Sequence, residues 1–362
     1  MTIDAAFDQA MMRRCVELAQ RAKGQTAPNP MVGSVVVQDN EIVGEGFHPQ
    51  AGQPHAEVFA LQAAGERSLG ATLYVNLEPC SHYGRTPPCA DAVIQASIAR
   101  VVVGMVDPNP KVAGSGIARL QAAGISVTVG VEENLCQTLN EAFVYKILHQ
   151  RPFGILKYAM TLDGKIAATT GHSAWVTTPA SRQYVHELRA GCDAIVVGGN
   201  TVRRDNPLLT SHGMGRNPLR VVMTQRLELP ENANVLHVDV APTLILTQTG
   251  TQPQRQDTLR EQGVEVVEVA DLSPAAAMKV LGDRGLLSVL WECGGQLTAQ
   301  AIGDGSIQKV LAFIAPKIIG GNMAPSPVGD LGLTQMTDAL MLERVTWRSI
   351  GADLLVEGYL KR

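Results

Sequence analysis

Four side chains in the first third of the chain have the types and the order expected of a catalytic zinc site. His55 and Glu57 stand together in the segment PHAE, and Cys80 and Cys89 follow, each directly after a proline. One imidazole and two thiolates supply three protein ligands. Because zinc takes four, such a set leaves one position open for water, as in catalytic rather than structural sites. We therefore predict that His55, Cys80 and Cys89 hold Zn²⁺.

Glu57 is the candidate proton carrier of this site. Zinc lowers the pKa of a bound water towards neutrality, and a neighbouring carboxylate can move protons between that water and a leaving amine. Two residues apart, His55 and Glu57 would face opposite sides of a regular helix. We expect them instead at a first helical turn behind Pro54, where both can project into one cleft. We expect Cys89 to begin a second helix, whose positive end favours a thiolate.

The order H-x-E and then P-C is the signature of the zinc nucleobase deaminases. Those enzymes usually have C-x-x-C, whereas residues 81–88 separate the two cysteines here. This longer segment suggests a substrate larger than a free base, and His82 within it is a rival metal ligand. The remaining cysteines lie in apolar contexts and are predicted to be core residues: Cys15, Cys136, Cys192 and Cys293.

Four motifs resemble the deaminase half of the bifunctional riboflavin-biosynthesis deaminase/reductase family: APNPMVG, GEGFH, PHAE and EPCSHYGRTPPC. The resemblance implies hydrolytic deamination of 2,5-diamino-6-(5-phosphoribosylamino)pyrimidin-4-one to the corresponding uracil. It also implies that Asn29 and His48 lie near the pyrimidine or its ribose phosphate. Taken alone, Asn29 is also consistent with a turn residue between two prolines.

The second half has two glycine turns, in residues 197–202 and 292–297, each between an expected strand and an expected helix. At such a turn the backbone can approach a pyrophosphate closely, and the helix N-terminus favours negative charge. The dinucleotide fingerprint G-x-G-x-x-G does not follow the first strand of this half. By themselves these glycines are also consistent with ordinary turns.

Four further motifs resemble the reductase half of the same family, which has a dihydrofolate-reductase-like fold: LKYAMTLDGKIA, SAWVT, GNTVRRDNPLLT and WECGGQLT. The resemblance implies NADPH as the hydride donor that reduces the ribosyl group to a ribityl chain, with Lys157 as a catalytic residue beside the reacting ribose. The implied NADPH contacts are Ala159, Trp175, Thr201, Asp205, Gly294, Gly295, Gln296 and Leu297. The implied substrate contacts are Ser173, Arg189, Leu209 and Glu292.

Two positions depart from that reductase pattern. The family usually has an arginine soon after its Leu-Thr pair, whereas this chain has His212 and, four residues later, Arg216. Either of these takes over the contact to the substrate phosphate, and the sequence does not decide between them. The family's Asp-Ser pair is replaced by Thr224-Gln225, at a position implied to contact the cofactor. Arginine is suited to binding a phosphate through two parallel hydrogen bonds, although Arg189 is also consistent with a solvated helix face.

The expected elements alternate between helices and strands, which is typical of α/β folds with largely parallel sheets. We expect a cytidine-deaminase-like αβα domain in residues 1–148 and a dihydrofolate-reductase-like α/β domain in residues 149–362. The expected helices of the first domain cover 4–23, 55–65, 114–123 and 132–148, with strands at 31–37, 71–77, 100–106 and 125–129. In the second, helices are expected at 179–190, 274–282 and 295–303, with strands at 154–160, 194–198, 219–223, 243–246, 264–269, 286–291 and 309–314. A turn at Asp163-Gly164 should lead to a return strand, and residues 247–256 should form a surface loop.

Composition narrows the functional class. The chain has 362 residues, 45% of them hydrophobic, and a net charge of −4. It contains no apolar run long enough to cross a membrane and no secretory signal, so we expect a cytoplasmic protein. The acidic balance argues against a nucleic-acid partner. We expect a small pyrimidine ribose phosphate as substrate and assembly into a homo-oligomer.

Two other functions are consistent with parts of this pattern. One is a deaminase of a nucleoside or a tRNA base with a non-catalytic, nucleotide-binding C-terminal domain. The acidic charge and the long segment between the cysteines argue against tRNA as the substrate. The other is a zinc-stabilised regulatory protein that senses a nucleotide. Glu57 argues against it, because a structural zinc needs no carboxylate beside an open position.

Overall fold

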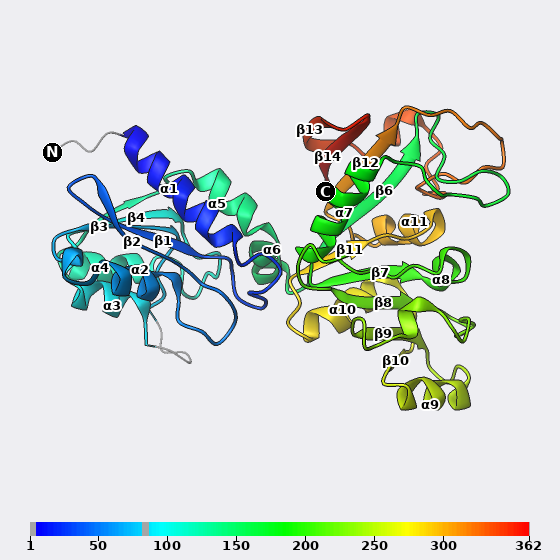
Figure 1. The fold of residues 1–362 in the computed structure, drawn as a ribbon, viewed down its shortest axis with the longest axis horizontal. Coiled ribbons are helices and arrows are strands. Elements are labelled where there is room, and N and C mark those ends of the chain that lie inside the picture. Colours follow the sequence, from blue (N-terminus) through cyan, green and yellow to red (C-terminus); the bar gives the residue numbers. More distant parts are fainter. Residues whose placement is uncertain (1–4, 82–86, 362) are drawn as a thin grey trace. The chain divides into compact units, whose positions relative to one another are not determined.

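The computed structural model describes residues 5–81 and 87–361. The chain divides into two compact units, Met1–Gln150 and Arg151–Arg362 (Figure 1). Each unit contains its own mixed sheet flanked by helices, which is the α/β class expected from the alternation of elements.

The first unit is a three-layer αβα structure around a five-stranded sheet of order β2-β1-β3-β4-β5. Helix α1 and helix α5 pack on one face of the sheet, and helices α2, α3 and α4 pack on the other. Strands β3, β4 and β5 run parallel, whereas β1 is antiparallel to both β2 and β3. The strands are β1 (Gly33–Gln38), β2 (Glu41–Phe47), β3 (Thr72–Leu77), β4 (Arg100–Met105) and β5 (Ser126–Val129). The helices are α1 (Ala5–Gln20), α2 (Ala56–Ala64), α3 (Cys89–Gln95), α4 (Ser115–Ala122), α5 (Glu133–Leu139) and α6 (Glu141–His149), with a 3₁₀ turn at Gly65–Ser68.

Two expectations for this unit were wrong in detail. The helix expected over 132–148 is two helices that meet at Asn140. The buried Asn140 side chain accepts a hydrogen bond from the Met31 amide and donates one to the Met31 carbonyl, at 2.8 and 3.0 Å. This contact with a distant segment competes with a continuous helix. Strand β2 was not expected, because its two glycines interrupt the apolar pattern.

The second unit is built on a nine-stranded sheet of order β10-β9-β8-β7-β11-β6-β12-β14-β13. The strands from β10 to β12 run parallel, and the β13–β14 hairpin adds the antiparallel end. The strands are β6 (Phe153–Thr161), β7 (Ala194–Gly198), β8 (Leu219–Met223), β9 (Thr243–Gln248), β10 (Glu265–Val269), β11 (Ser288–Trp291), β12 (Lys309–Ala315), β13 (Leu342–Ile350) and β14 (Asp353–Leu360). The helices are α7 (Pro179–Ala190), α8 (Gly199–Asp205), α9 (Pro253–Glu261), α10 (Pro274–Asp283) and α11 (Gly295–Gly303), with 3₁₀ turns at Asn234–Leu236 and Met336–Asp338.

Two further expectations fail in this unit. Residues 165–167 form no return strand. The Asp163 carboxylate accepts hydrogen bonds from the Thr161 hydroxyl and the amides of Ile319 and Gly320. The turn closes with a bond from the Thr161 amide to the Lys165 carbonyl, but the next amide, of Ile166, donates to Pro325, so the pairing with β6 does not continue. The polar stretch 247–256 is not a continuous surface loop, because it contains the end of β9 and the start of α9. Pro253 at the beginning of α9 is typical of a helix start. The polar composition of the segment led instead to the expectation of a loop.

The cysteines outside the predicted zinc site fit a packing role. Cys15, Cys136 and Cys192 are buried, Cys293 is half-buried, and all six cysteines of the chain are free thiols. Among residues 5–81 and 87–361, the helices are too short or too polar to cross a bilayer.

Candidate active sites

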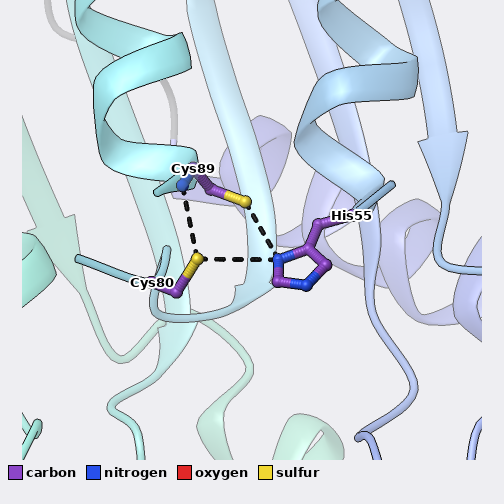
Figure 2. A group of neighbouring side chains, drawn as sticks. All are labelled: His55, Cys80 and Cys89. Carbon is purple, nitrogen blue, oxygen red and sulfur yellow. Dashed lines mark hydrogen bonds between the residues drawn. The ribbon is translucent and has the colours of Figure 1, made fainter. Parts of the chain in front are cut away.

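The first unit brings the three predicted metal ligands together. The ligand atoms of His55, Cys80 and Cys89 lie within 4.8 Å of one another. His55 Nδ1 is 3.1 Å from Cys89 Sγ and 3.6 Å from Cys80 Sγ, and the Cys89 amide lies 3.3 Å from Cys80 Sγ (Figure 2). Hydrogen bonds from Cys89 and His55 lower the pKa of the Cys80 thiol, which favours the thiolate that a metal requires. The rival ligand His82 lies outside the described residues.

Local helix starts explain this convergence. His55 is the N-cap residue of α2, and Glu57 lies in the first turn of that helix, as the sequence predicted. Cys89 is the first residue of α3, after Pro88 at the N-cap. Both helices therefore direct their amino ends towards the cluster (Figure 2), and the first two amides of α3, those of Cys89 and Ala90, donate to Cys80.

Glu57 is buried and incompletely paired. Its Oε2 atom has no hydrogen-bond partner among the described residues. Burial raises the pKa of the Glu57 carboxyl to about 7, which allows it to hold or release a proton near neutral pH. One imidazole, two thiols and a buried carboxyl oxygen without a partner together fit a zinc ion with an open position.

The expected substrate residues Asn29 and His48 form a hydrogen-bonded pair beside this cluster. His48 Nδ1 lies 3.0 Å from the Pro54 carbonyl oxygen, which can only accept, so Nδ1 carries the proton. His48 Nε2 then accepts from Asn29 Nδ2 at 3.0 Å. Burial lowers the pKa of His48, which favours this neutral form. The pairing leaves the amide oxygen of Asn29 as the acceptor of that side chain.

Glu78 is a positioning residue that the sequence reasoning missed. Its buried carboxylate accepts hydrogen bonds from the amides of Asp107, Gly114, Gly116 and Ile117. It thereby fixes the loop before α4 against the segment that carries Cys80. A Cβ atom at Gly116 would lie 2.0 Å from the Pro79 carbonyl oxygen, so this approach requires glycine. The signal in the sequence was an acidic residue at the end of an apolar strand, directly before Pro79-Cys80.

The second site lies at the carboxyl ends of three central strands of the nine-stranded sheet. Strands β6, β11 and β7 are neighbours and run parallel, so their carboxyl ends meet at the same edge. Lys157 and Ala159 lie in β6, Glu292 follows β11, and Gly198 ends β7. The topology therefore brings residues from three distant segments of the chain to the same end of the parallel strands.

Glu292, Arg189 and Lys157 form one charged cluster. Arg189 Nε and Nη2 donate to the two Glu292 oxygens at 2.8 and 3.0 Å, and Lys157 Nζ lies 3.5 Å from Oε2. Burial alone would raise the pKa of Glu292, but the charges of Arg189 and Lys157 hold it down at about 2. Arg189 Nη1 donates to the Thr210 carbonyl at 3.2 Å. The paired donors of Arg189 are thus directed at Glu292 in this structure.

The glycine turns occupy the expected places between strands and helices. Gly294 caps α11, and a side chain there would enter open space, so the amino end of this helix is accessible. Gly295 packs closely, because its Cβ would lie 2.8 Å from the Ser326 carbonyl oxygen. Gly199 begins α8, and a Cβ atom there would lie 3.0 Å from the hydroxyl of Thr224, the residue that replaces an acidic one in the family pattern. Gln296 and Leu297 lie in the first turn of α11, and Thr201 and Asp205 lie in α8.

A hollow of about 260 Å³ is lined by Ser173 and Trp175 together with residues near the end of β12. Trp175 is 69% exposed, and the Arg182 guanidinium lies 4.6 Å from its ring centre. An exposed indole at the rim of a hollow offers a planar surface against which a ring can stack. Ser173 and Trp175, expected to contact the substrate and NADPH respectively, therefore line the same hollow.

The residues that depart from the family pattern lie on a structured loop. His212 is exposed and stacks on His186 of α7, with ring centres 4.1 Å apart and planes inclined by 25°. Arg216 is also exposed, whereas the side chain of Leu209 is buried. His186 was not singled out from the sequence, because a single histidine on a helix gives no motif signal.

Two family models match the chain. The RibD C-terminal domain matches residues 152–356, more than half of the chain, and the zinc-binding region of cytidine and deoxycytidylate deaminases matches residues 5–105. The first match does not favour a base deaminase with a non-catalytic C-terminal domain.

Whole-length relatives agree with both models. The riboflavin biosynthesis protein RibD of Synechocystis sp. is 61% identical over 98% of this chain and 96% of its own length. That of Aquifex aeolicus is 41% identical over 97% and 98%. The solved structure of Acinetobacter baumannii RibD superposes with a TM-score of 0.89 at 35% identity and covers 99% of this chain and 100% of its own.

A second solved structure carries an activity in its name. The Thermotoga maritima diaminohydroxyphosphoribosylaminopyrimidine deaminase/5-amino-6-(5-phosphoribosylamino)uracil reductase superposes with a TM-score of 0.87 at 36% identity, over 99% of both chains. The chain is therefore a member of the RibD family of bifunctional riboflavin-biosynthesis deaminase/reductases.

Proposed function

We propose that residues 1–148 of this deaminase/reductase carry the deamination and that residues 149–362 carry the reduction. The substrate of the first step is 2,5-diamino-6-(5-phosphoribosylamino)pyrimidin-4-one, and its uracil product is the substrate of the second. The observation that carries this proposal is that each family model falls within one compact unit that has its own polar cluster. The cofactors are Zn²⁺ for the first unit and NADPH for the second.

In the deaminase site, His55, Cys80 and Cys89 would hold zinc, which supplies a water that is activated near neutral pH. Glu57 takes a proton from the attacking water and passes it to the leaving amino group. Its burial and its unpartnered oxygen support this role, because such a carboxyl can exist in both protonation states near pH 7. The amide oxygen of Asn29, oriented by His48, accepts a hydrogen bond from the pyrimidine ribose phosphate.

In the reductase site, NADPH supplies a hydride to C1′ of the ribosyl group. As the C1′–O4′ bond breaks, its electron pair goes to O4′, which takes a proton from Lys157 Nζ. Glu292 supports this role, because it stays ionised and holds the Lys157 ammonium in place. Ser173, Arg189, Leu209 and Glu292 surround the substrate, and either His212 or Arg216 meets its phosphate. NADPH contacts Ala159, Trp175, Thr201, Asp205 and the turn Gly294–Leu297.

A coupled assay tests this function. Purified protein of known metal content is given the diaminopyrimidinone ribose phosphate and NADPH, and ammonia release and NADPH absorbance are followed together. We expect ammonia first and NADPH oxidation afterwards, at matching stoichiometry. Release of ammonia without oxidation of NADPH would contradict the proposed reduction and leave the second unit with a binding role only. Neither signal from a zinc-loaded protein would contradict the assigned substrate.

We further propose that the chain forms a homo-oligomer through strand β13, which ends the nine-stranded sheet of the second unit. Trp347 in this strand is 70% exposed and Met341 just before it 66%, and an exposed sheet edge with large apolar side chains favours association. Light scattering should give a mass above that of one chain, and Trp347→Glu should lower it. A wild-type monomer would contradict the proposal.

We also propose that the protein acts in the cytoplasm, which is supported by its six free thiols. Cell fractionation tests this, and recovery with the membrane or an extracellular fraction would contradict it.

A further inference from the structure

The reductase substrate carries a phosphate monoester under the function proposed above, and the cations beside Glu292 are already engaged. Arg189 directs Nε and Nη2 at Glu292 and Nη1 at the Thr210 carbonyl. Lys157 is directed at the same carboxylate. A phosphate in this site therefore needs other donors, unless a buried ion pair opens.

Two histidines lie beside this cluster and come from different segments. His186 precedes Arg189 by about one helical turn on α7. His212 lies two residues after Thr210, whose carbonyl oxygen accepts a hydrogen bond from Arg189. Their rings are stacked, with centres 4.1 Å apart. His186 is half-buried and His212 is exposed, so the pair extends from the charged cluster to the surface of the protein.

The loop that carries His212 is internally fixed. The Ser211 amide donates to Asn217 Oδ1 at 2.9 Å, and the Ser211 hydroxyl donates to the Gly215 carbonyl at 2.7 Å. His212 itself has a φ of 49°, a left-handed conformation that such a loop has to hold in place. The stacked arrangement is therefore set by the fold of the loop and by helix α7 together.

The surroundings of the pair favour neutral rings when no anion is bound. Burial, His212, Arg189 and Arg182 lower the pKa of His186 to about 4, against the opposing effect of Glu292. Burial and Arg189 also lower the pKa of His212. A phosphate dianion beside these groups reverses the balance, because its charge stabilises the protonated imidazole.

We propose that the stacked His186–His212 pair binds the phosphate monoester of the reductase substrate and takes up a proton as it does so. This proposal rests on the function proposed above and deepens it. The pair supplies ring N–H donors where the family pattern has an arginine. Unlike an arginine, it makes phosphate binding depend on pH in the range around neutrality.

The test uses the full chain with the uracil ribose phosphate and NADPH. We expect the KM for this substrate to rise about tenfold in His212→Gln and in His186→Gln at pH 6.5. In the wild type the same KM should rise between pH 6.5 and 8. His212→Arg should keep a low KM and lose this pH dependence, because arginine stays charged. His237→Gln, which removes an exposed imidazole of the same unit, serves as the matched control.

Several results would overturn the proposal. An unchanged substrate KM in both glutamine variants would exclude the pair as a binding site. A rise in the KM for NADPH alone would assign the pair to the phosphate of the cofactor instead. A pH profile of His212→Arg equal to that of the wild type would exclude proton uptake by the pair. Failure of the wild type to oxidise NADPH would contradict the proposed function itself, whereas wild-type turnover with unaffected variants would contradict this proposal alone.

Discussion

Two buried glutamates, one in each unit, have opposite surroundings. Glu57 has an oxygen without a partner among the described residues, and burial raises its pKa to about 7. Glu292 accepts hydrogen bonds from Arg189 and Lys157, and despite its burial their charges hold its pKa at about 2. The same side chain is therefore able to exchange a proton in one unit and is fixed as an anion in the other.

This difference matches the two reactions. Hydrolytic deamination moves protons between water and a leaving amine, so it needs a carboxyl that titrates near the working pH. The proposed hydride transfer needs no such carboxyl, but the role proposed for Lys157 needs its ammonium group to be held beside the reacting ribose. In each unit, the groups around the glutamate set the pKa of its carboxyl.

The largest effect is expected from Glu57→Gln. Loss of the proton carrier should lower the rate of ammonia release about a thousandfold. Zinc content and NADPH oxidation with the uracil substrate should stay at wild-type values, because Glu57 is not a proposed ligand and lies in the other unit. Metal analysis and the two assays check this, with the exposed Glu66→Gln as control. Loss of zinc from the variant would make Glu57 a ligand and contradict the mechanism.

Lys157→Ala should have the next largest effect, on the other reaction. Without its proton donor, the reduction should slow about a hundredfold, while ammonia release is unaffected. Steady-state NADPH absorbance measures the first rate and an ammonia assay the second. Lys165→Ala removes a lysine from the same segment LKYAMTLDGKIA and is the matched control. Loss of both activities in Lys157→Ala would contradict independent sites.

The zinc cluster could be predicted from the sequence because its ligands lie at helix starts, where local signals such as Pro54 and Pro88 operate. Lys157, within β6, and Glu292, directly after β11, were predicted from motifs that resemble those of the reductase family, not from local signals. The pairing of Arg189 with Glu292 could not be predicted, because that contact joins positions far apart in the chain. The break of the helix at Asn140 has the same origin, since a contact with a distant backbone overrides a periodic pattern.

The paired carboxylate should also matter for stability. Glu292→Gln leaves the positive charges of Arg189 and Lys157 without their anionic partner, which we expect to lower the free energy of unfolding of the second unit by about 3 kcal/mol at pH 7. The three tryptophans, Trp175, Trp291 and Trp347, all lie in this unit, so denaturant unfolding followed by tryptophan fluorescence reports on it alone.

The pH dependence of this difference has a defined sign. The folded-state pKa of Glu292, about 2, lies below the ordinary value of 4.5. Its stabilising contribution is therefore present above pH 4.5 and is lost as the pH falls towards 2. The gap between the wild type and Glu292→Gln should shrink over this interval. A gap that does not change with pH would show that the charge of Glu292 is not what stabilises the unit.

The smallest effect is expected from Asn29→Ala in the deaminase site. Removing one neutral hydrogen bond to the substrate should raise the KM for deamination by up to about tenfold. His48→Gln should have a smaller effect of the same kind, because His48 only orients the Asn29 amide. The competing view is that Asn29 is a turn residue, and its amide does donate to the Thr26 carbonyl at 2.8 Å. That main-chain bond survives in Asn29→Ala, so an unchanged KM with lowered thermal stability would support the turn and remove Asn29 from the substrate site.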